Sequence, residues 1–131
     1  NGGLCLSVSQ SGQSPDIVEM ARSARHEGAL AIAITNDASS PLAEASNHAL
    51  DIHAGPELSV AATKTFVTSA VAGLLLLAEW RQDEALLKAI HQLPEALEQA
   101  AAIDWPKVRQ ALSGTNSLFT LGRGPAWAIS N

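Results

Sequence analysis

The sequence predicts an α/β fold in which helices cover both faces of a parallel sheet. Three observations predict it: short apolar runs alternate with amphipathic segments, the first two runs contain no charged residue, and polar loops follow these runs directly. Uncharged apolar runs are typical of strands buried on both faces, and strands that alternate with helices are usually parallel. We therefore expect a three-layer α/β/α domain.

The first strand and helix lie at the start of the chain. Leu4–Val8 is a short apolar run that suits a buried strand. Ser14, Pro15 and Asp16 form a helix-start signal, because serine can cap the helix, proline fits its first turn and aspartate suits its positive end. Gly28 then suits the C-terminal end of this helix.

The next elements repeat the alternation. Ala29–Thr35 is a second apolar strand, and Pro41–Ala45 is a short helix. His48–Ile52 alternates polar and apolar residues, which favours a strand near the edge of the sheet. A long helix is expected over Ser59–Trp80. It is apolar on more than one face, so we expect it to pack against a second domain copy or a partner subunit.

The last part of the chain changes character. Asp83–Leu112 is predicted to be helical and amphipathic, in two or three pieces separated at Pro94 and Pro106. Ser117–Leu121 is predicted to be a further strand, and the glycines of Gly122–Pro125 suggest a tight strand-to-helix turn.

Composition excludes several classes of function. The 131 residues are 47% hydrophobic, and eight Lys and Arg against thirteen Asp and Glu give a formal charge of −5. Without a basic cluster we expect no nucleic-acid partner, and without a long uninterrupted apolar run we expect no membrane span. Cys5 is the only cysteine, and the four histidines form no spaced cluster. We therefore expect a reducing cytoplasm, no intrachain disulfide, no metal site and no cofactor.

The loop Ser9–Ser14 is the strongest candidate for chemistry. It joins a buried strand to a helix start, where unpaired amides attract anions, and its serines and glutamine add neutral donors. Gly12 would let the backbone approach a ligand closely. The same residues would also suit an ordinary strand–helix turn that is capped by serine and binds no ligand. The loops Asn36–Ser40 and Ala54–Val60 should lie at the same edge of the sheet, where α/β domains bind ligands.

Three motifs in order carry a resemblance to a known family. Ser9–Asp16 is similar to the SQSGET-type phosphosugar loop of sugar isomerase (SIS) domains. Ala54–Glu57 followed by Val60–Phe66 is similar to the AGPE-x-x-VASTKAFT signature of the isomerase half of glucosamine-fructose-6-phosphate aminotransferase and of stand-alone double-SIS relatives. Leu121–Gly124 is similar to the LGRG opening of a second SIS copy. The resemblance implies a flavodoxin-like parallel sheet.

The resemblance also implies roles for individual residues. The positions that would bind the sugar phosphate are Ser9, Gln10, Ser11, Gly12 and Ser14, and the backbone of Val60 would face the sugar. The chain departs from the family pattern at three positions: Gln13 replaces a glutamate, Ser14 a threonine and Ala62 a serine. The family's catalytic glutamate helix, ring-opening histidine and C-terminal lysine would follow Asn131, so no catalytic residue is assigned.

The function implied is phosphosugar binding within a larger, dimeric enzyme. That enzyme would be an aldose–ketose isomerase or an aminosugar-phosphate deaminase or aminotransferase acting on fructose 6-phosphate or glucosamine 6-phosphate. The expected division is a first SIS domain over 1–82 that lacks its first strand and helix, an inter-domain helical segment over 83–115 and the start of a second SIS domain over 116–131. A non-catalytic phosphosugar sensor is the alternative, although no helix-turn-helix region is evident. A generic flavodoxin-like domain would leave the ordered motifs unexplained.

Overall fold

A computed structural model describes residues 2–58 and 62–123. The chain divides into two compact units, Asn1–Leu93 and Pro94–Asn131. The first unit contains the sheet and every segment that the sequence suggests for ligand binding. The second contains the end of one helix and a further short helix.

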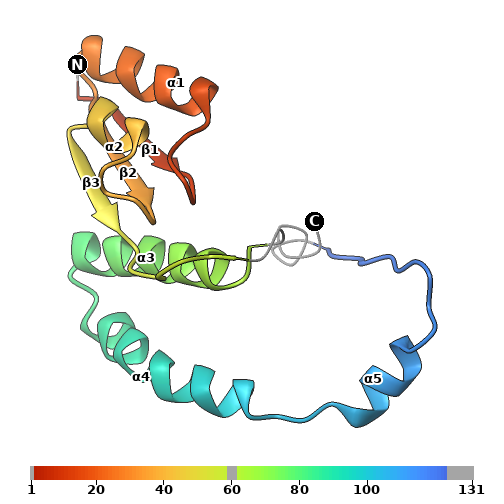
Figure 1. The fold of residues 1–131 in the computed structure, drawn as a ribbon. Helices are drawn as coiled ribbons and strands as arrows, with labels where there is room; N and C mark the ends of the chain where they lie inside the picture. Colours follow the sequence, from red (N-terminus) through yellow and green to blue (C-terminus); the bar gives the residue numbers. More distant parts are fainter. Residues whose placement is uncertain (1, 59–61, 124–131) are drawn as a thin grey trace. The chain divides into compact units, whose positions relative to one another are not determined.

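Three strands of the first unit form one parallel sheet in the order β1–β2–β3 (Figure 1). The strands are β1 (Leu4–Val8), β2 (Leu30–Thr35) and β3 (His48–Asp51). The prediction of a parallel α/β fold is confirmed, and the three predicted strands of this unit are found within one residue of their expected bounds. The expected edge position of β3 is also found.

Two helices cover one face of the sheet. They are α1 (Pro15–His26) and α2 (Pro41–Ala45), and both lie on the same side of the strands in Figure 1. Ala33 faces them in the core cluster, together with Val18 and Ala21 of α1 and Leu42 and Ala45 of α2. Small alanines on the strand allow these helices to approach the sheet closely.

The opposite face is only partly covered. Ile34 is 1% exposed, and it lies on the side of β2 that faces the long helix α3 (Lys64–Arg81). Three side chains of β1 on the same side, however, remain 44%, 44% and 50% exposed: Leu4, Leu6 and Val8. The expectation that β1 is a buried strand is therefore wrong for the described residues. The reason is that β1 is an edge strand of this sheet and α3 leaves its apolar face uncovered.

The helix bounds correct two further expectations. The long helix begins at Lys64 and not at Ser59, because Ala62 and Thr63 are not helical; Ser59–Ala61 lies outside the described residues. Pro94 does not divide the next helix, since α4 (Glu84–Ala101) continues through it. Only the segment 102–105 separates α4 from α5 (Pro106–Leu112).

The predicted strand Ser117–Leu121 is not found. This segment has no strand pairing, and Leu118, Phe119 and Leu121 are 63%, 90% and 95% exposed. A strand needs a neighbour to bond its backbone, and within residues 94–123 the structure contains no other strand to supply one. The Gly122–Pro125 turn falls partly outside the described residues.

Candidate functional site

The loop after β1 is held by the backbone of the neighbouring strand. The Ser9 amide donates to the Ile34 carbonyl at 3.0 Å, and the Asn36 amide donates to the Gln10 carbonyl at 3.0 Å. The buried Thr35 hydroxyl also donates to the Gln10 carbonyl, at 3.2 Å. The parallel pairing of β1 and β2 therefore continues into the start of the loop and fixes Ser9 and Gln10.

Gly12 has a packing role that the sequence did not predict. It is buried with φ +61°, and a Cβ placed on it would lie 2.1 Å from Oγ and 2.5 Å from Cβ of Ser40. Its carbonyl accepts from the Leu42 amide at 3.1 Å. The absent side chain thus makes room for the start of α2. That the backbone of Gly12 also approaches a ligand closely stays a prediction.

The serine hydroxyls of the loop keep their protons available. The oxygens of Ser9 and Ser11 accept from the amides of Gly12 and Gln13, at 3.2 and 3.3 Å. A hydroxyl that accepts in this way can still donate its own proton to an anion. Ser14 is the N-cap residue of α1, but its side chain makes no capping hydrogen bond, so the expected serine cap is not formed. Its hydroxyl is not committed to the helix.

The two other expected loops are joined to each other. The Asn36 side chain donates from Nδ2 to the Gly55 carbonyl at 2.8 Å and accepts at Oδ1 from the Ala54 amide at 2.9 Å. The sequence placed both loops at the carboxyl edge of the sheet, and the structure brings them together there. In the first of them Asp37 accepts from Ser39, and these bonds lower the pKa of the Asp37 carboxyl.

Glu57 organises the start of α3. Its Oε2 accepts from the amides of Thr63 and Thr65, at 3.2 and 3.0 Å, and from the Thr65 hydroxyl at 3.2 Å. Its Oε1 accepts from the Thr63 hydroxyl at 3.4 Å. The hydrogen bond from the Thr65 amide is the main reason why the pKa of Glu57 is lowered, and Lys64 contributes a smaller electrostatic effect.

A cleft of about 400 Å³ lies between the β1 loop and α3. Its residues come from the end of β1 and the loop after it, from the segment just before α3 and from the first half of α3: Val8, Ser9, Gln10, Ala62, Thr65, Phe66, Ser69 and Ala70. Of the predicted site residues, Ser9 and Gln10 line this cleft. Ser11, Gly12 and Ser14 lie in the same loop but do not line it, and Val60 lies outside the described residues.

Sequence reasoning missed the wall that α3 contributes to the cleft. Thr65 and Phe66 belong to the motif around Lys64, but no local pattern shows that they face Ser9 across the sheet edge. Lys64 itself is exposed, and its Nζ donates to the Pro56 carbonyl at 2.7 Å. The cleft is therefore lined by neutral residues among those that the structure describes.

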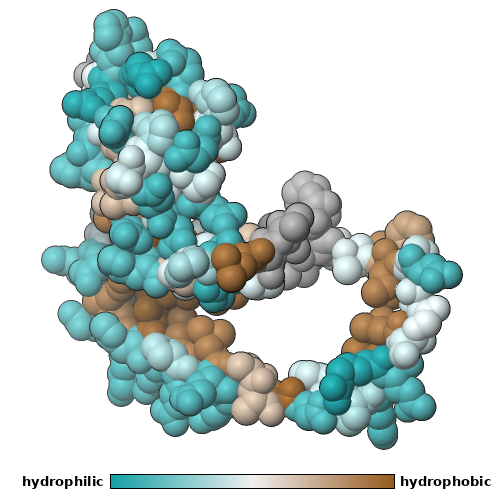
Figure 2. Space-filling model, in the orientation of Figure 1, coloured by the Kyte–Doolittle hydropathy of each residue, from teal (hydrophilic) through white to brown (hydrophobic). Residues whose placement is uncertain are grey.

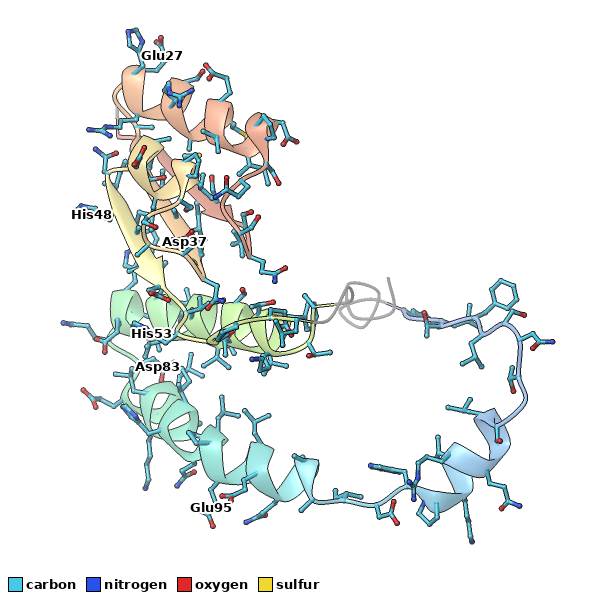
Figure 3. The ribbon with its side chains drawn as sticks, in the orientation of Figure 1. Glu27, Asp37, His48, His53, Asp83 and Glu95 are labelled. Carbon is cyan, nitrogen blue, oxygen red and sulfur yellow. The ribbon has the colours of Figure 1, made fainter. Side chains whose placement is uncertain are left out.

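The histidines of the described residues form no group that could hold a metal ion. His48 is the first residue of β3, and His53 lies beyond the other end of that strand, which is Asp51 (Figure 3). No cluster of three or more His, Cys, Asp and Glu residues suited to a metal ion occurs within the described ranges. Across 2–58 and 62–123, no helix combines the length and apolar character that crossing a membrane requires.

Comparison with known proteins identifies the family to which this chain is similar. The family model of the SIS domain matches residues 1–79. The chain is similar to two enzymes named glutamine–fructose-6-phosphate aminotransferase (isomerizing). The enzyme of Sulfolobus acidocaldarius is 33% identical to this chain over 126 residues, and the match covers 92% of this chain and 21% of that enzyme. That of Halobacterium salinarum is 36% identical over 131 residues, covering 92% of this chain and 22% of its own length.

A solved structure is also similar. It is a crystal structure of a protein from Silicibacter pomeroyi DSS-3, described provisionally as a phosphosugar isomerase, with a TM-score of 0.89 and 65% identity. The match covers 98% of this chain and 39% of that one, whereas the chain spans about a fifth of the two curated relatives. The three ordered motifs, the parallel sheet and the family match agree: this chain belongs to the SIS domain family.

Proposed function

We propose that this chain binds the phosphate of a phosphosugar through its Ser9–Ser14 loop. The observation that carries the proposal is that this loop is fixed in place but has donors to spare. Hydrogen bonds to β2 and the loop after it hold its backbone. The hydroxyl protons of Ser9 and Ser11 and the uncapped start of α1 remain available to an anion. The adjoining cleft offers room for a sugar. In this proposal Ser9, Gln10, Ser11 and Ser14 contact the phosphate, and Val60 faces the sugar.

Gly12 supports this site indirectly. It lets the loop pack on Ser40, and thereby holds the neighbouring serines in place. The neutral lining of the cleft means that the phosphate would be held by hydroxyls and backbone amides, without a lysine or arginine from the described residues. Hydrogen bonds to a charged acceptor are strong enough for this task, at about 1.5–3 kcal/mol each.

The relatives' names support a proposal for the reaction of the whole protein. We propose an aldose–ketose isomerase or an aminosugar-phosphate deaminase or aminotransferase acting on fructose 6-phosphate or glucosamine 6-phosphate. Ring opening would be followed by proton transfer between adjacent carbons through an enediol-type intermediate. In this view residues 1–82 belong to a first SIS domain, 83–115 to an inter-domain helical segment and 116–131 to a second SIS domain.

We further propose a homodimer in the cytoplasm. Hydrophobic surface gathers over α3 and the start of α4 in the space-filling view (Figure 2). Several large apolar side chains of α3 are 38–70% exposed: Phe66, Val67, Leu74, Leu75, Leu77 and Trp80. Such a helix needs cover, which a second SIS domain or a partner subunit would supply. Sedimentation of the complete protein at micromolar concentration would contradict the dimer by showing a single monomeric species.

Calorimetric titration of the complete protein with fructose 6-phosphate and with fructose tests the ligand. We expect the phosphorylated sugar to bind much more tightly. Ser9→Ala and Ser11→Ala should each lower affinity about ten- to a hundredfold, because each removes a donor to a charged acceptor. Ser23→Ala, an exposed serine of α1 distant from the loop in sequence, is the matched control. Equal affinities for the two sugars, or a wild-type-like double variant, would overturn the proposal.

A further inference from the structure

Glu57 precedes α3 and yet holds its first turn. Both carboxylate oxygens are used: Oε2 accepts from the amides of Thr63 and Thr65, and Oε1 accepts from the Thr63 hydroxyl. Thr63 is the N-cap residue of α3, but its side chain makes no capping hydrogen bond. The amides that an N-cap side chain normally satisfies are therefore satisfied by a carboxylate from an earlier part of the chain.

The same carboxylate reaches a residue of the cleft. Oε2 of Glu57 accepts from the Thr65 hydroxyl at 3.2 Å, and Thr65 is only 1% exposed. Thr65 and the following Phe66 line the cleft opposite Ser9 and Gln10. Any displacement of the first turn of α3 would therefore change the width of the cleft.

The two walls of the cleft depend on different restraints. Ser9 and Gln10 are fixed by backbone hydrogen bonds to β2 and its loop. The start of α3 makes no backbone hydrogen bond to a strand among the described residues. Its hydrogen bonds to the preceding loop are those of Glu57 and the bond from Lys64 Nζ to the Pro56 carbonyl. Both groups are charged, but Glu57 accepts four hydrogen bonds from Thr63 and Thr65 whereas Lys64 donates one to Pro56, so Glu57 carries the larger part of this restraint.

We propose that Glu57 is a positioning residue of the phosphosugar cleft, which holds Thr65 and Phe66 at the correct distance from Ser9 and Gln10. This inference rests on the proposed function. It assigns to Glu57 no contact with the sugar and no transfer of a proton. Its effect on the ligand passes through the first turn of α3.

The experiment compares three variants of the complete protein: Glu57→Gln, Glu57→Asp and Glu57→Ala. The matched control is Glu44→Gln, because the Glu44 carboxylate in α2 makes no hydrogen bond in the described structure and lies outside the cleft. The first measurement is amide hydrogen exchange at Thr63 and Thr65 without ligand. The second is affinity for fructose 6-phosphate by calorimetry.

We expect Glu57→Gln and Glu57→Ala to lose protection at both amides about tenfold and to lose affinity for fructose 6-phosphate by about the same factor. Glu57→Asp should recover part of both losses, since it restores the charge on a shorter side chain. Glu44→Gln should match the wild type. Thr65→Val, which removes one of the hydroxyl donors, should weaken binding less in the Glu57→Gln background than in the wild type.

The outcomes separate the two proposals. A wild-type protein that does not bind fructose 6-phosphate or glucosamine 6-phosphate overturns the proposed function. Unchanged amide exchange in Glu57→Ala overturns the positioning role whatever the ligand result. Faster exchange with unchanged affinity also overturns it, because Glu57 would then support the helix without affecting the cleft.

Discussion

The two walls of the cleft are held in place by different means. The β1 loop is held by backbone bonds to β2, by the buried Thr35 hydroxyl and by the close approach of Gly12 to Ser40. The start of α3 is held largely by one partly exposed carboxylate, Glu57. The first wall therefore depends on packing and should fail through loss of stability. The second depends on charge and should fail through altered binding or pH.

Gly12→Ala should give the largest effect. The new Cβ would overlap Ser40 Oγ at 2.1 Å in a backbone with φ +61°, so we expect a loss of about 3 kcal/mol or more in the free energy of unfolding. Denaturant unfolding of the complete protein measures it. Gly28→Ala is the matched control, because Gly28 also has positive φ, +82°, but a Cβ added there would meet no atom within 4 Å. Equal losses for the two variants would contradict the packing role of Gly12.

Thr35→Val should have the next largest effect. It removes the donor to the Gln10 carbonyl and the acceptor of the Asp37 amide, both at a side chain that is 0% exposed. We expect a loss of about 1–3 kcal/mol in the free energy of unfolding, because buried polar groups lose a partner. Thr35→Ser keeps the hydroxyl and should lose less. If the valine and serine variants unfold at the same denaturant concentration, the hydroxyl is not what holds the loop.

Acid should weaken the α3 wall through Glu57. The folded-state pKa of this carboxyl lies below its usual value of 4.5, chiefly because of the bond from the Thr65 amide. Its stabilising contribution is therefore present above pH 4.5 and is lost as pH falls through the lowered pKa. Denaturant midpoints of wild type and Glu57→Gln should converge as pH falls. Asp37, whose pKa is also lowered, remains in both proteins. A constant difference would contradict the prediction.

Ser14→Ala should have the smallest effect on stability. A serine cap removed from a helix usually costs about 0.5–2 kcal/mol, but the Ser14 side chain makes no capping bond here. We therefore expect a change below about 0.5 kcal/mol in the free energy of unfolding, together with weaker binding of fructose 6-phosphate. A larger stability loss without a change in affinity would show that the hydroxyl serves the helix.

The sequence predicted most of the elements because their signals are local. An uncharged apolar run such as Ala29–Thr35 predicts a strand without knowledge of its neighbours in the fold. Pro41 likewise marks the first turn of the short helix α2. The errors occurred where the outcome depends on distant partners. Ser117–Leu121 has a suitable composition for a strand, but it is not a strand in the structure, and residues 94–123 contain no other strand to pair with it.

The candidate site was predicted only in part for the same reason. Ser9 and Gln10 follow a strand and could be placed at the sheet edge from the chain itself. The pairing of Glu57 with Thr65 depends on how the chain bends between them, and the close approach of Gly12 and Ser40 joins two loops distant in the sequence. A glycine in a loop does not reveal which neighbour its missing side chain would meet, so the role of Gly12 could not be inferred from composition.

The neutral lining of the cleft has a consequence for the speed of association. With a formal charge of −5, this chain attracts no anion from a distance, and no lysine or arginine of the described residues lines the cleft to focus one. A phosphosugar would therefore arrive by unassisted diffusion against a weak repulsion. Added salt screens such repulsion over about a Debye length, so the association rate should rise slightly with ionic strength, the reverse of the behaviour of a site built around arginines.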